Sequence, residues 1–225
     1  MYSGIYDAVR GCRIQKLRFD AIASNMANIT TGAFKKDVIS FDELLGLHTV
    51  TDFSQGNIRY TGNPLDVALQ GEGFFKVETP AGIRYTRNGR FARNADGVIV
   101  TQNGDPVLGE RGPILIHGNN VSIDSEGRVV VDNTEVDRLP VYKFERSEYL
   151  QKEGLSYYIY RGDEEEVFRA DDTLVKGGYL EESNVVIAEE MVKMMDTLRT
   201  FESYQKVLQS FDETDGRVIN EVGKP

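Results

Sequence analysis

The sequence predicts a mainly β protein whose two ends are helical: an antiparallel β domain flanked by N- and C-terminal helices of the coiled-coil type. Near both ends the apolar residues recur in steps of three and four, the spacing of one helix face. Between them lie short runs of β-favouring residues separated by turn sequences. We therefore expect 1–32 and 183–222 to form a helical domain, 33–62 an extended connector and 63–182 a β domain.

The first helix is expected from about residue 3 to about residue 29. Asn25 and Asn28 are poor helix formers near its end, and they are candidates for side-chain contacts with a neighbour. Gly32 ends the segment, because glycine readily takes the left-handed conformation that follows many helices. The apolar line along one side of this helix consists of Met1, Ile5, Ala8, Cys12, Gln15, Phe19, Ile22, Met26 and Ile29.

The connector is polar and has few regular features. Its apolar residues indicate a short amphipathic turn, and 49–61 is expected to be extended chain around the turn Gln55-Gly56-Asn57. The residues of that predicted amphipathic turn are Phe34, Val38, Phe41, Leu44 and Leu45.

From residue 63 to about residue 180 the apolar pattern becomes that of short strands without intervening helices, which is typical of an antiparallel β domain. The turn sequences that separate the runs are Gly71-Glu72-Gly73, Pro80-Ala81-Gly82, Asn94-Ala95-Asp96-Gly97, Gln102-Asn103-Gly104-Asp105 and Asp124-Ser125-Glu126-Gly127.

The last helix begins after Ser183 or Asn184, either of which is a suitable N-cap. Residues 1–29 carry four basic and two acidic side chains, a net charge of +2, whereas 181–221 carry four basic and ten acidic ones, a net charge of −6. Opposite signs beside two apolar lines favour pairing of the two helices, within one subunit or between subunits; the alternative is two solvated faces. The second line consists of Ile187, Met191, Met194, Leu198, Phe201, Gln205 and Leu208.

The whole chain has a formal net charge of −10, which argues against nucleic acid or an anionic membrane as its main partner. No apolar run approaches the ~18 residues of a membrane span, and charges interrupt any signal-peptide core. Taken alone, these features indicate a cytoplasmic protein. The single cysteine, Cys12, excludes an intrachain disulfide and is expected to act as a small apolar residue.

Nothing in the sequence indicates an active site. His48 and His117 have no second ligand at a metal-binding spacing. The glycine pair in 71–75 lacks the third glycine and the helix of a phosphate loop. The acidic run 163–166 lacks the turn glycine of a calcium loop. We therefore expect no catalytic residues, no cofactor and no metal.

Several motifs resemble the flagellar basal-body rod and hook protein family, in the family's order and over nearly the whole chain. Ala33 is a departure, because the family usually places the aromatic residue directly after the glycine. The motifs are Ser24-Asn25-Met26-Ala27-Asn28-Ile29-Thr30-Thr31-Gly32-Ala33-Phe34-Lys35, Gly62-Asn63-Pro64-Leu65-Asp66-Val67-Ala68-Leu69, Gly71-Glu72-Gly73-Phe74-Phe75, Tyr85-Thr86-Arg87-Asn88-Gly89, Glu182-Ser183-Asn184-Val185 and Glu190-Met191-Val192.

The resemblance implies a non-enzymatic subunit of a helical tube, with the terminal helices inside and the β domain outside. It implies copies of itself and other rod subunits as partners, no membrane insertion, and export by the flagellar type III apparatus without a cleaved signal peptide. The location would then be periplasmic, which replaces the cytoplasmic interpretation. The short connector and the ending 212–217 resemble the proximal-rod member of the family more than the distal-rod member.

We expect the two apolar lines to form the assembly interface. One alternative is a distal-rod or hook subunit; a more distant one is a secreted β-domain binding module or enzyme that dimerises through its helices. The residues assigned to the interface are Ile5, Ala8, Cys12, Phe19, Ile22, Asn25, Met26, Asn28, Ile29, Ile187, Met191, Met194, Leu198, Phe201 and Leu208.

Overall fold

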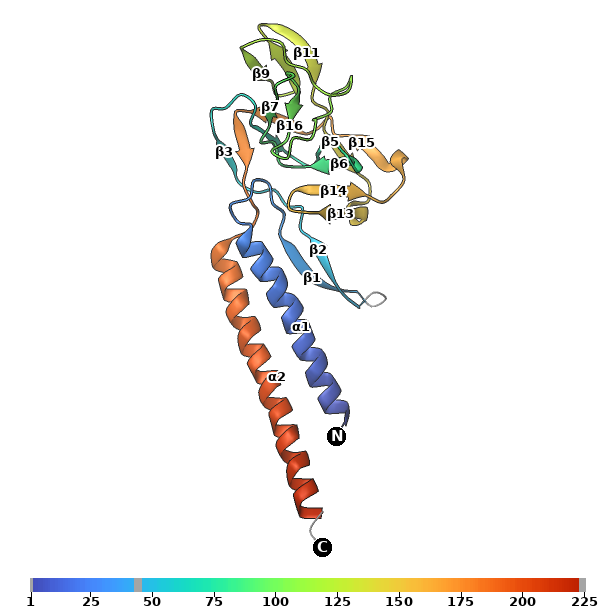
Figure 1. Ribbon diagram of the computed structural model, residues 1–225, viewed down its shortest axis with the longest axis vertical. Coiled ribbons are helices and arrows are strands. Elements are labelled where there is room, and N and C mark those ends of the chain that lie inside the picture. The colour runs from blue at the N-terminus through green and yellow to red at the C-terminus, as the bar shows by residue number, and fades with distance from the viewer. Residues whose placement is uncertain (1, 43–45, 223–225) are drawn as a thin grey trace. The chain divides into compact units, whose positions relative to one another are not determined.

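The computed structural model describes residues 2–42 and 46–222, and the chain falls into two compact units (Figure 1). The helical unit comprises Met1–Ala27, Asp37–Asp52 and Val186–Pro225, and the β unit comprises Asn28–Lys36 and Phe53–Val185. The chain therefore passes between the two units four times, and each unit is built from segments that are far apart in sequence.

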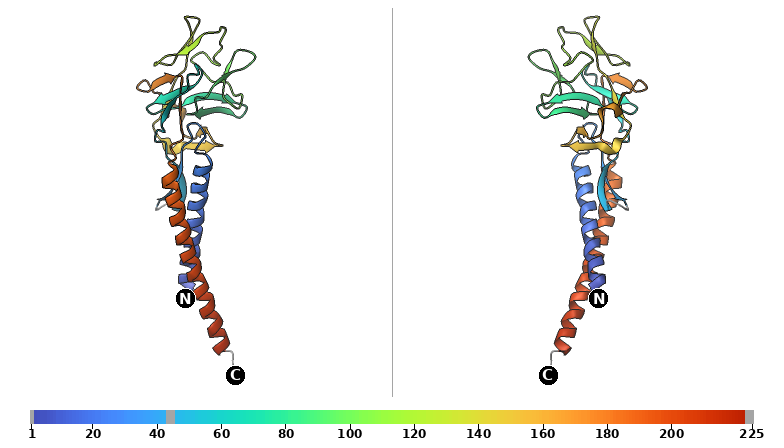
Figure 2. Two further views of the ribbon diagram at one scale, coloured as in Figure 1. Left: turned by 90° about the vertical axis from the view of Figure 1, so that its left-hand side faces the viewer. Right: turned by 90° about the vertical axis from the view of Figure 1, so that its right-hand side faces the viewer.

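The helical unit contains α1 (Tyr2–Ala27), α2 (Ile187–Val222) and the strands β1 (Asp37–Asp42) and β2 (Gly46–Thr51). The two helices lie side by side in the views of both Figure 1 and Figure 2. They run in opposite directions, because Gly4 of α1 lies against Phe211 and Gly11 lies against Tyr204. α2 has 36 residues against 26 in α1 and extends past its partner's N-terminal end (Figure 2).

The connector differs from the prediction of a short amphipathic turn. Val38 and Phe41 lie in β1, which pairs with β2 in an antiparallel hairpin, with Val38 opposite Val50 and Phe41 opposite Leu47. The segment 47–51 is rich in β-branched residues and supplies a partner strand, so the backbone hydrogen bonds of a hairpin replace those of a helical turn. Leu44 and Leu45, which were part of that prediction, lie outside the described residues.

The β unit consists of short strands, and every pairing among its described strands is antiparallel. The largest sheet has the order β13-β14-β6-β5, followed by a three-stranded sheet β11-β10-β9 and four strand pairs. These elements are β3 (Ile58–Tyr60), β4 (Val67–Gln70), β5 (Phe75–Thr79), β6 (Gly82–Thr86), β7 (Ala92–Arg93), β8 (Ile99–Val100), β9 (Val121–Ile123), β10 (Arg128–Val131), β11 (Thr134–Arg138), β12 (Tyr142–Phe144), η1 (Ser147–Tyr149), β13 (Leu150–Glu153), β14 (Tyr157–Tyr160), η2 (Glu164–Glu166), β15 (Val167–Arg169), β16 (Leu174–Gly177) and β17 (Tyr179–Glu181).

The prediction of a mainly β chain with antiparallel sheets and two terminal helices is therefore confirmed. Two of the predicted turns depend on a glycine in the left-handed region: Gly97 has φ +84° and Gly127 has φ +79°. A side chain at Gly127 would also place its Cβ 2.6 Å from the carbonyl oxygen of Leu139, so both conformation and space require glycine there.

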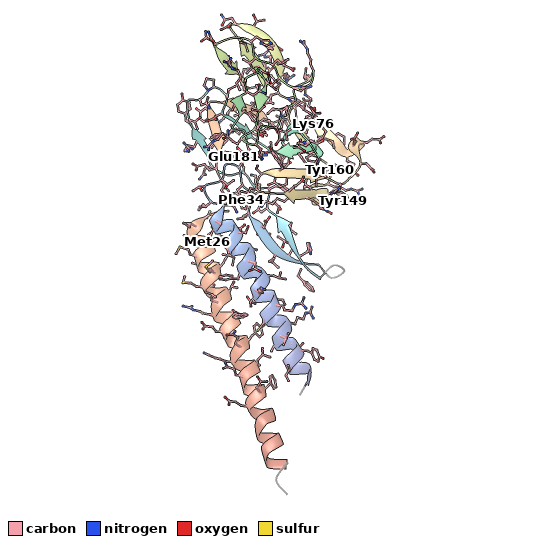
Figure 3. The ribbon with its side chains drawn as sticks, viewed as in Figure 1. Met26, Phe34, Lys76, Tyr149, Tyr160 and Glu181 are labelled. Carbon is pink, nitrogen blue, oxygen red and sulfur yellow. The ribbon has the colours of Figure 1, made fainter. Side chains whose placement is uncertain are left out.

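Two apolar clusters fill the β unit. The larger one is mainly aliphatic and includes Val67, Leu69, Phe75 and Val77, all without solvent exposure. The smaller one is aromatic and surrounds Tyr158; it extends towards Tyr160, which lies near Tyr149 in Figure 3. The ring of Tyr158 meets those of Phe53 and Phe74 edge to face, the arrangement that aromatic quadrupoles favour. These clusters give the β unit a closed core of its own.

Candidate assembly site

Small residues of α1 allow the two helices to approach closely. Ala8 is 4% exposed, and the ring of Tyr204 occupies the space beside Gly11. A Cβ at Gly11 would lie 2.4 Å from a ring carbon of Tyr204, and one at Gly4 would lie 2.9 Å from the ring of Phe211. The aromatic side chains of α2 therefore pack into gaps that only glycine provides on α1.

Polar side chains occupy the other end of the helix contact. Asn25 is 1% exposed; its Nδ2 donates to the carbonyl oxygen of Asp37 at 2.9 Å and to Oε2 of Glu190 at 3.2 Å. Its Oδ1 accepts from the amide of Asp37 at 2.8 Å, and Lys193 Nζ donates to Glu190 Oε1 at 2.6 Å. Asn25 thus joins α1, β1 and α2 within the chain.

A groove of about 340 Å³ lies beside this polar cluster, between α1, β1 and α2. Its walls combine apolar residues such as Ile22 and Ile39 with the charged side chains of Arg18, Glu190 and Lys193. The mixture of opposite charges and apolar surface gives the groove no single ligand chemistry.

The predicted apolar line of α2 divides into two parts. Met194, Phe201 and Leu208 are partly buried and lie on the face that carries Glu190, Thr197 and Tyr204 towards α1. Of the other members, Ile187, Met191 and Leu198 are 50%, 52% and 44% exposed, and Gln205 is also exposed. Met195, which is 51% exposed, continues this second row, so an apolar row remains uncovered on α2. We call Ile187, Met191, Met195 and Leu198 the α2 outer row.

The predicted line of α1 divides in the same way. Ala8, Gln15 and Ile22 are buried, as are Gly11 and Asn25, whereas the remaining described members of the line are partly buried. These partly buried members are Ile5, Cys12, Phe19, Met26 (labelled in Figure 3) and Ile29; Asn28, which was assigned to the interface, is also partly buried. Met1 lies outside the described residues.

A separate exposed row runs along the outer side of α1. Tyr6 is 74% exposed, Val9 43% and Leu17 46%, and their spacing places them with Arg13 on one side of the helix. Arg10 and Lys16 flank this row and are also exposed. We call Tyr6, Val9, Arg13 and Leu17 the α1 outer row; it was not among the residues assigned to an interface from the sequence.

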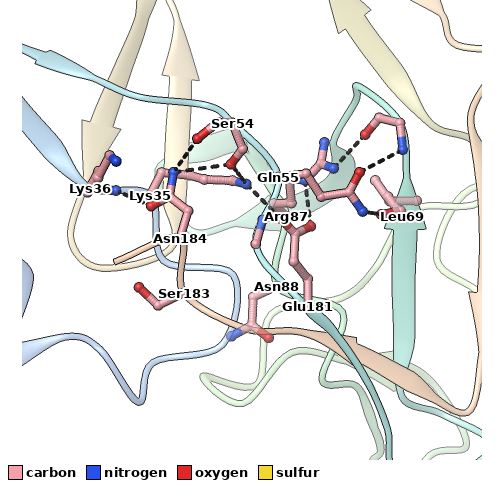
Figure 4. A network of polar contacts seen from close by, with 12 residues as sticks. Lys35, Lys36, Ser54, Gln55, Leu69, Arg87, Asn88, Glu181, Ser183 and Asn184 are labelled. Atoms are coloured by element: carbon pink, nitrogen blue, oxygen red, sulfur yellow. Dashed lines mark hydrogen bonds and ion pairs between the residues drawn. The ribbon is translucent and has the colours of Figure 1, made fainter. Parts of the chain in front are cut away.

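The β unit contains a buried ionic network that the sequence did not reveal (Figure 4). The side chains of Lys35, Arg87 and Glu181 are 0–3% exposed. Lys35 Nζ donates to Glu181 Oε1 at 2.7 Å, and Arg87 Nε donates to Glu181 Oε2 at 2.7 Å. Glu181 and Lys35 also form hydrogen bonds with the backbone: the amide of Gly56 donates to Glu181 Oε1 at 2.9 Å, and Lys35 Nζ donates to the carbonyl oxygen of Ser54 at 2.6 Å.

The network ties together the segments at which the chain enters and leaves the β unit. Lys35 belongs to the segment after α1, and Glu181 to the segment before α2. Arg87 also donates to the carbonyl oxygens of Gly71 and Gly73. Lys35 and Arg87 lie within two of the sequence motifs quoted above, and Glu181 directly precedes a third. Charged residues at these positions were the signal available in the sequence.

Asn184 and Ser183 are part of the same region and do not cap α2. Asn184 Oδ1 accepts from the amide of Lys36 at 2.8 Å, and its Nδ2 donates to Ser54 (Figure 4). Ser183 Oγ accepts from the amide of Val185, two residues before the helix begins. The predicted capping role is therefore wrong, because these side chains hold the entering and leaving segments instead.

Ala33, which the sequence singled out as a departure from the family pattern, takes a left-handed conformation with φ +52°. Its amide donates to the carbonyl oxygen of Glu181 at 2.9 Å, and Phe34 is buried beneath Lys152, whose Nζ lies 3.8 Å from the ring centroid. The aromatic side chain of Phe34 is thus buried next to a residue in a conformation that L-residues rarely adopt.

Within residues 2–42 and 46–222, no three His, Cys, Asp or Glu side chains gather as metal ligands would. Neither described helix has the length and apolar character that crossing a membrane requires.

Two family models match the chain. The description "Flagellar hook protein FlgE/F/G D1 domain" matches residues 68–131, and "Flagellar basal body rod FlgEFG protein C-terminal" matches residues 176–221. The first match covers part of the β unit, and the second covers most of α2.

Curated relatives match over nearly their full length. The flagellar basal-body rod protein FlgF of Salmonella typhimurium is 34% identical, covering 96% of this chain and 97% of the relative. FlgF of Mesorhizobium japonicum is 29% identical, with 99% of each chain covered. The rod protein FlgG of Bacillus subtilis is 27% identical, with 98% and 99% covered. The chain therefore belongs to the flagellar basal-body rod protein family.

Proposed function

We propose that this protein is a subunit of the proximal flagellar rod and that it polymerises through its terminal helices to transmit torque. The observation that supports polymerisation is the α2 outer row, four apolar side chains that are each about half exposed along three turns of helix. A row of this kind on a helix is favourable only when another surface covers it. The three-and-four spacing of the buried positions suits packing of the coiled-coil type.

The proximal rod is favoured over the distal rod by length. The alignment to FlgF of Mesorhizobium japonicum spans 238 positions, close to the 225 residues of this chain, whereas that to FlgG of Bacillus subtilis spans 261. The longer alignment requires more gaps in this chain. A distal-rod or hook subunit is the alternative, and locating the protein in purified basal bodies distinguishes the two.

In this proposal the chain is structural and not an enzyme, and its partners are copies of itself and other rod subunits. Residues 1–32 and 183–222 form the core of the rod, and 63–182 form its outer part. The location is the basal body in the periplasm, reached through the flagellar export apparatus without a cleaved signal peptide. Packed helices suit torque transmission, because close-packed interiors deform little under load.

The test is complementation of a strain in which this gene is deleted. The unchanged chain should restore rods and swimming. The double variant Met191→Asp, Leu198→Asp should abolish both, because it places two carboxylates in the surface that assembly buries. Its helix content by circular dichroism should be unchanged, since both positions are half exposed in the chain itself.

The matched control is Ser203→Asp, which adds a carboxylate at an exposed position on a different face of α2. This variant should swim normally. Normal rods in the double variant would contradict assembly through the α2 outer row, and failure of the unchanged chain to restore rods would contradict the rod function itself.

A further inference from the structure

The contacts between α1 and α2 define which residues of the two antiparallel helices lie at the same position along the helix axis. Moving seven residues along α1, from Gly4 to Gly11, moves the contact seven residues back along α2, from Phe211 to Tyr204. The pair Asn25 and Glu190 continues the same register. Leu17 is therefore level with Leu198 of its own chain.

At this register the two outer rows do not match in height. The α2 outer row runs from Ile187 to Leu198, level with the polar end of α1, where Asp20 and Ser24 are exposed. The α1 outer row lies further towards the N-terminus, from Tyr6 to Leu17. If α2 of one molecule packed against α1 of a second molecule without an axial offset, the methionine side chains of the α2 outer row would thus face polar side chains of α1.

The mismatch is removed if the second molecule is shifted along the helix axis by seven residues, about 10 Å of helix. Leu17 then meets Met191, the aliphatic part of Arg13 meets Met195, and Val9 meets Leu198. Glu202, the next exposed residue in line with the α2 outer row, comes level with Tyr6 and within a turn of Arg10. The offset therefore matches apolar with apolar side chains and places an acid near a base.

We propose that the α2 outer row of one molecule binds the α1 outer row of a second copy, with an offset of about two helical turns. This inference rests on the proposed function and specifies its contact. The occupant is a second copy because the α1 outer row supplies both the apolar side chains and the positive charge that the negatively charged α2 lacks. The contact joins two different surfaces, so it leaves a free row at each end and builds an open helical assembly.

The alternative contact pairs the α2 outer row with the same row of a second copy. Such a contact joins two identical surfaces and closes into a dimer. It would leave the α1 outer row exposed and would bring two acidic helices together. Cross-linking distinguishes the two contacts.

The experiment uses full-length chains in which Cys12→Ser removes the native thiol. Two variants, Leu17→Cys and Met191→Cys, are co-expressed in the deletion strain, and the assembled basal bodies are treated with a short bismaleimide. Because each chain carries one thiol, any cross-link joins two molecules, and mass spectrometry of the peptides identifies the joined positions. The expected product joins position 17 to position 191.

The matched control pairs Leu17→Cys with Leu198→Cys, the position at equal height. Its yield should be about tenfold lower, because the offset places these two positions about 10 Å further apart along the helix axis. If either variant prevents swimming, Val9→Cys with Leu198→Cys tests the same offset.

Swimming cells with normal rods and no link between positions 17 and 191 would overturn this contact while leaving the rod function intact. A dominant link between two copies of position 191 would overturn it in favour of the α2–α2 contact. Failure of the unchanged chain to build rods would instead count against the proposed function.

Discussion

Charged residues lie inside the β unit and are paired there, whereas apolar residues lie on the outside of the helical unit. Glu181 is 2% exposed and bonded to two cations, while Met191 and Met195 are about half exposed. The β unit thus pairs these buried charges within one chain, and the helical unit retains a row of half-exposed apolar side chains along α2. In the proposed assembly, the β unit would be complete once it folds, and the helical unit only once a second molecule covers the α2 outer row.

The largest expected effect comes from breaking the ionic network. Glu181→Ala should lower the free energy of unfolding of the β unit by about 3–5 kcal/mol, because Lys35 and Arg87 would remain buried without their counter-ion. Urea unfolding and hydrogen exchange of peptides from the β unit measure the loss.

The neighbouring Glu182→Ala is the control. Glu182 pairs with Arg59, and both side chains are about half exposed, so its removal should cost less than about 1 kcal/mol. If both variants lowered the free energy of unfolding equally, the contribution of the Glu181 ion pairs to stability would not depend on their burial.

A smaller effect should follow from closing the gap on α1. Gly11→Ala places a methyl group where the ring of Tyr204 lies and should destabilise the helical unit by up to about 3 kcal/mol. The measurement is hydrogen exchange in α1 and α2, with the β unit unchanged.

Gly216→Ala in α2 serves as the comparison, because no atom of the described part of the chain lies within 4 Å of a Cβ there. It should stabilise the helix by as much as about 1 kcal/mol, the difference in helix propensity between the two residues. A stabilising Gly11→Ala would contradict the close packing of the two helices.

The smallest effect concerns the left-handed residue at which the chain enters the β unit. Ala33→Val should cost about 1–2 kcal/mol, since a β-branched residue tolerates positive φ poorly. Ala33→Gly should be nearly neutral, because relief of strain is offset by greater freedom of the unfolded chain and loss of a buried methyl group. Thermal unfolding of both variants checks the order; a neutral Ala33→Val would mean that the segment readily changes conformation.

The apolar spacing predicted both helices but not which side of each faces the other. A three-and-four pattern fits two adjacent lines of α2 that share Met194, Phe201 and Leu208, so spacing alone could not choose between them. The choice depends on where α1 permits close approach, and Gly11 and Ala8 permit it beside Tyr204. Asn25 was correctly noted as unusual in a helix, yet its contacts lie within the chain.

The amino-acid sequence by itself determined the helical ends, the antiparallel β class and the family, because periodicity and turn residues are local properties and the motifs are read directly. Only the tertiary structure decided that Lys35, Arg87 and Glu181 meet, since their positions in the chain do not encode distance in space. The same holds for the outer rows: whether Met191 or Met194 is covered depends on the partner helix and not on either residue's own neighbours in sequence.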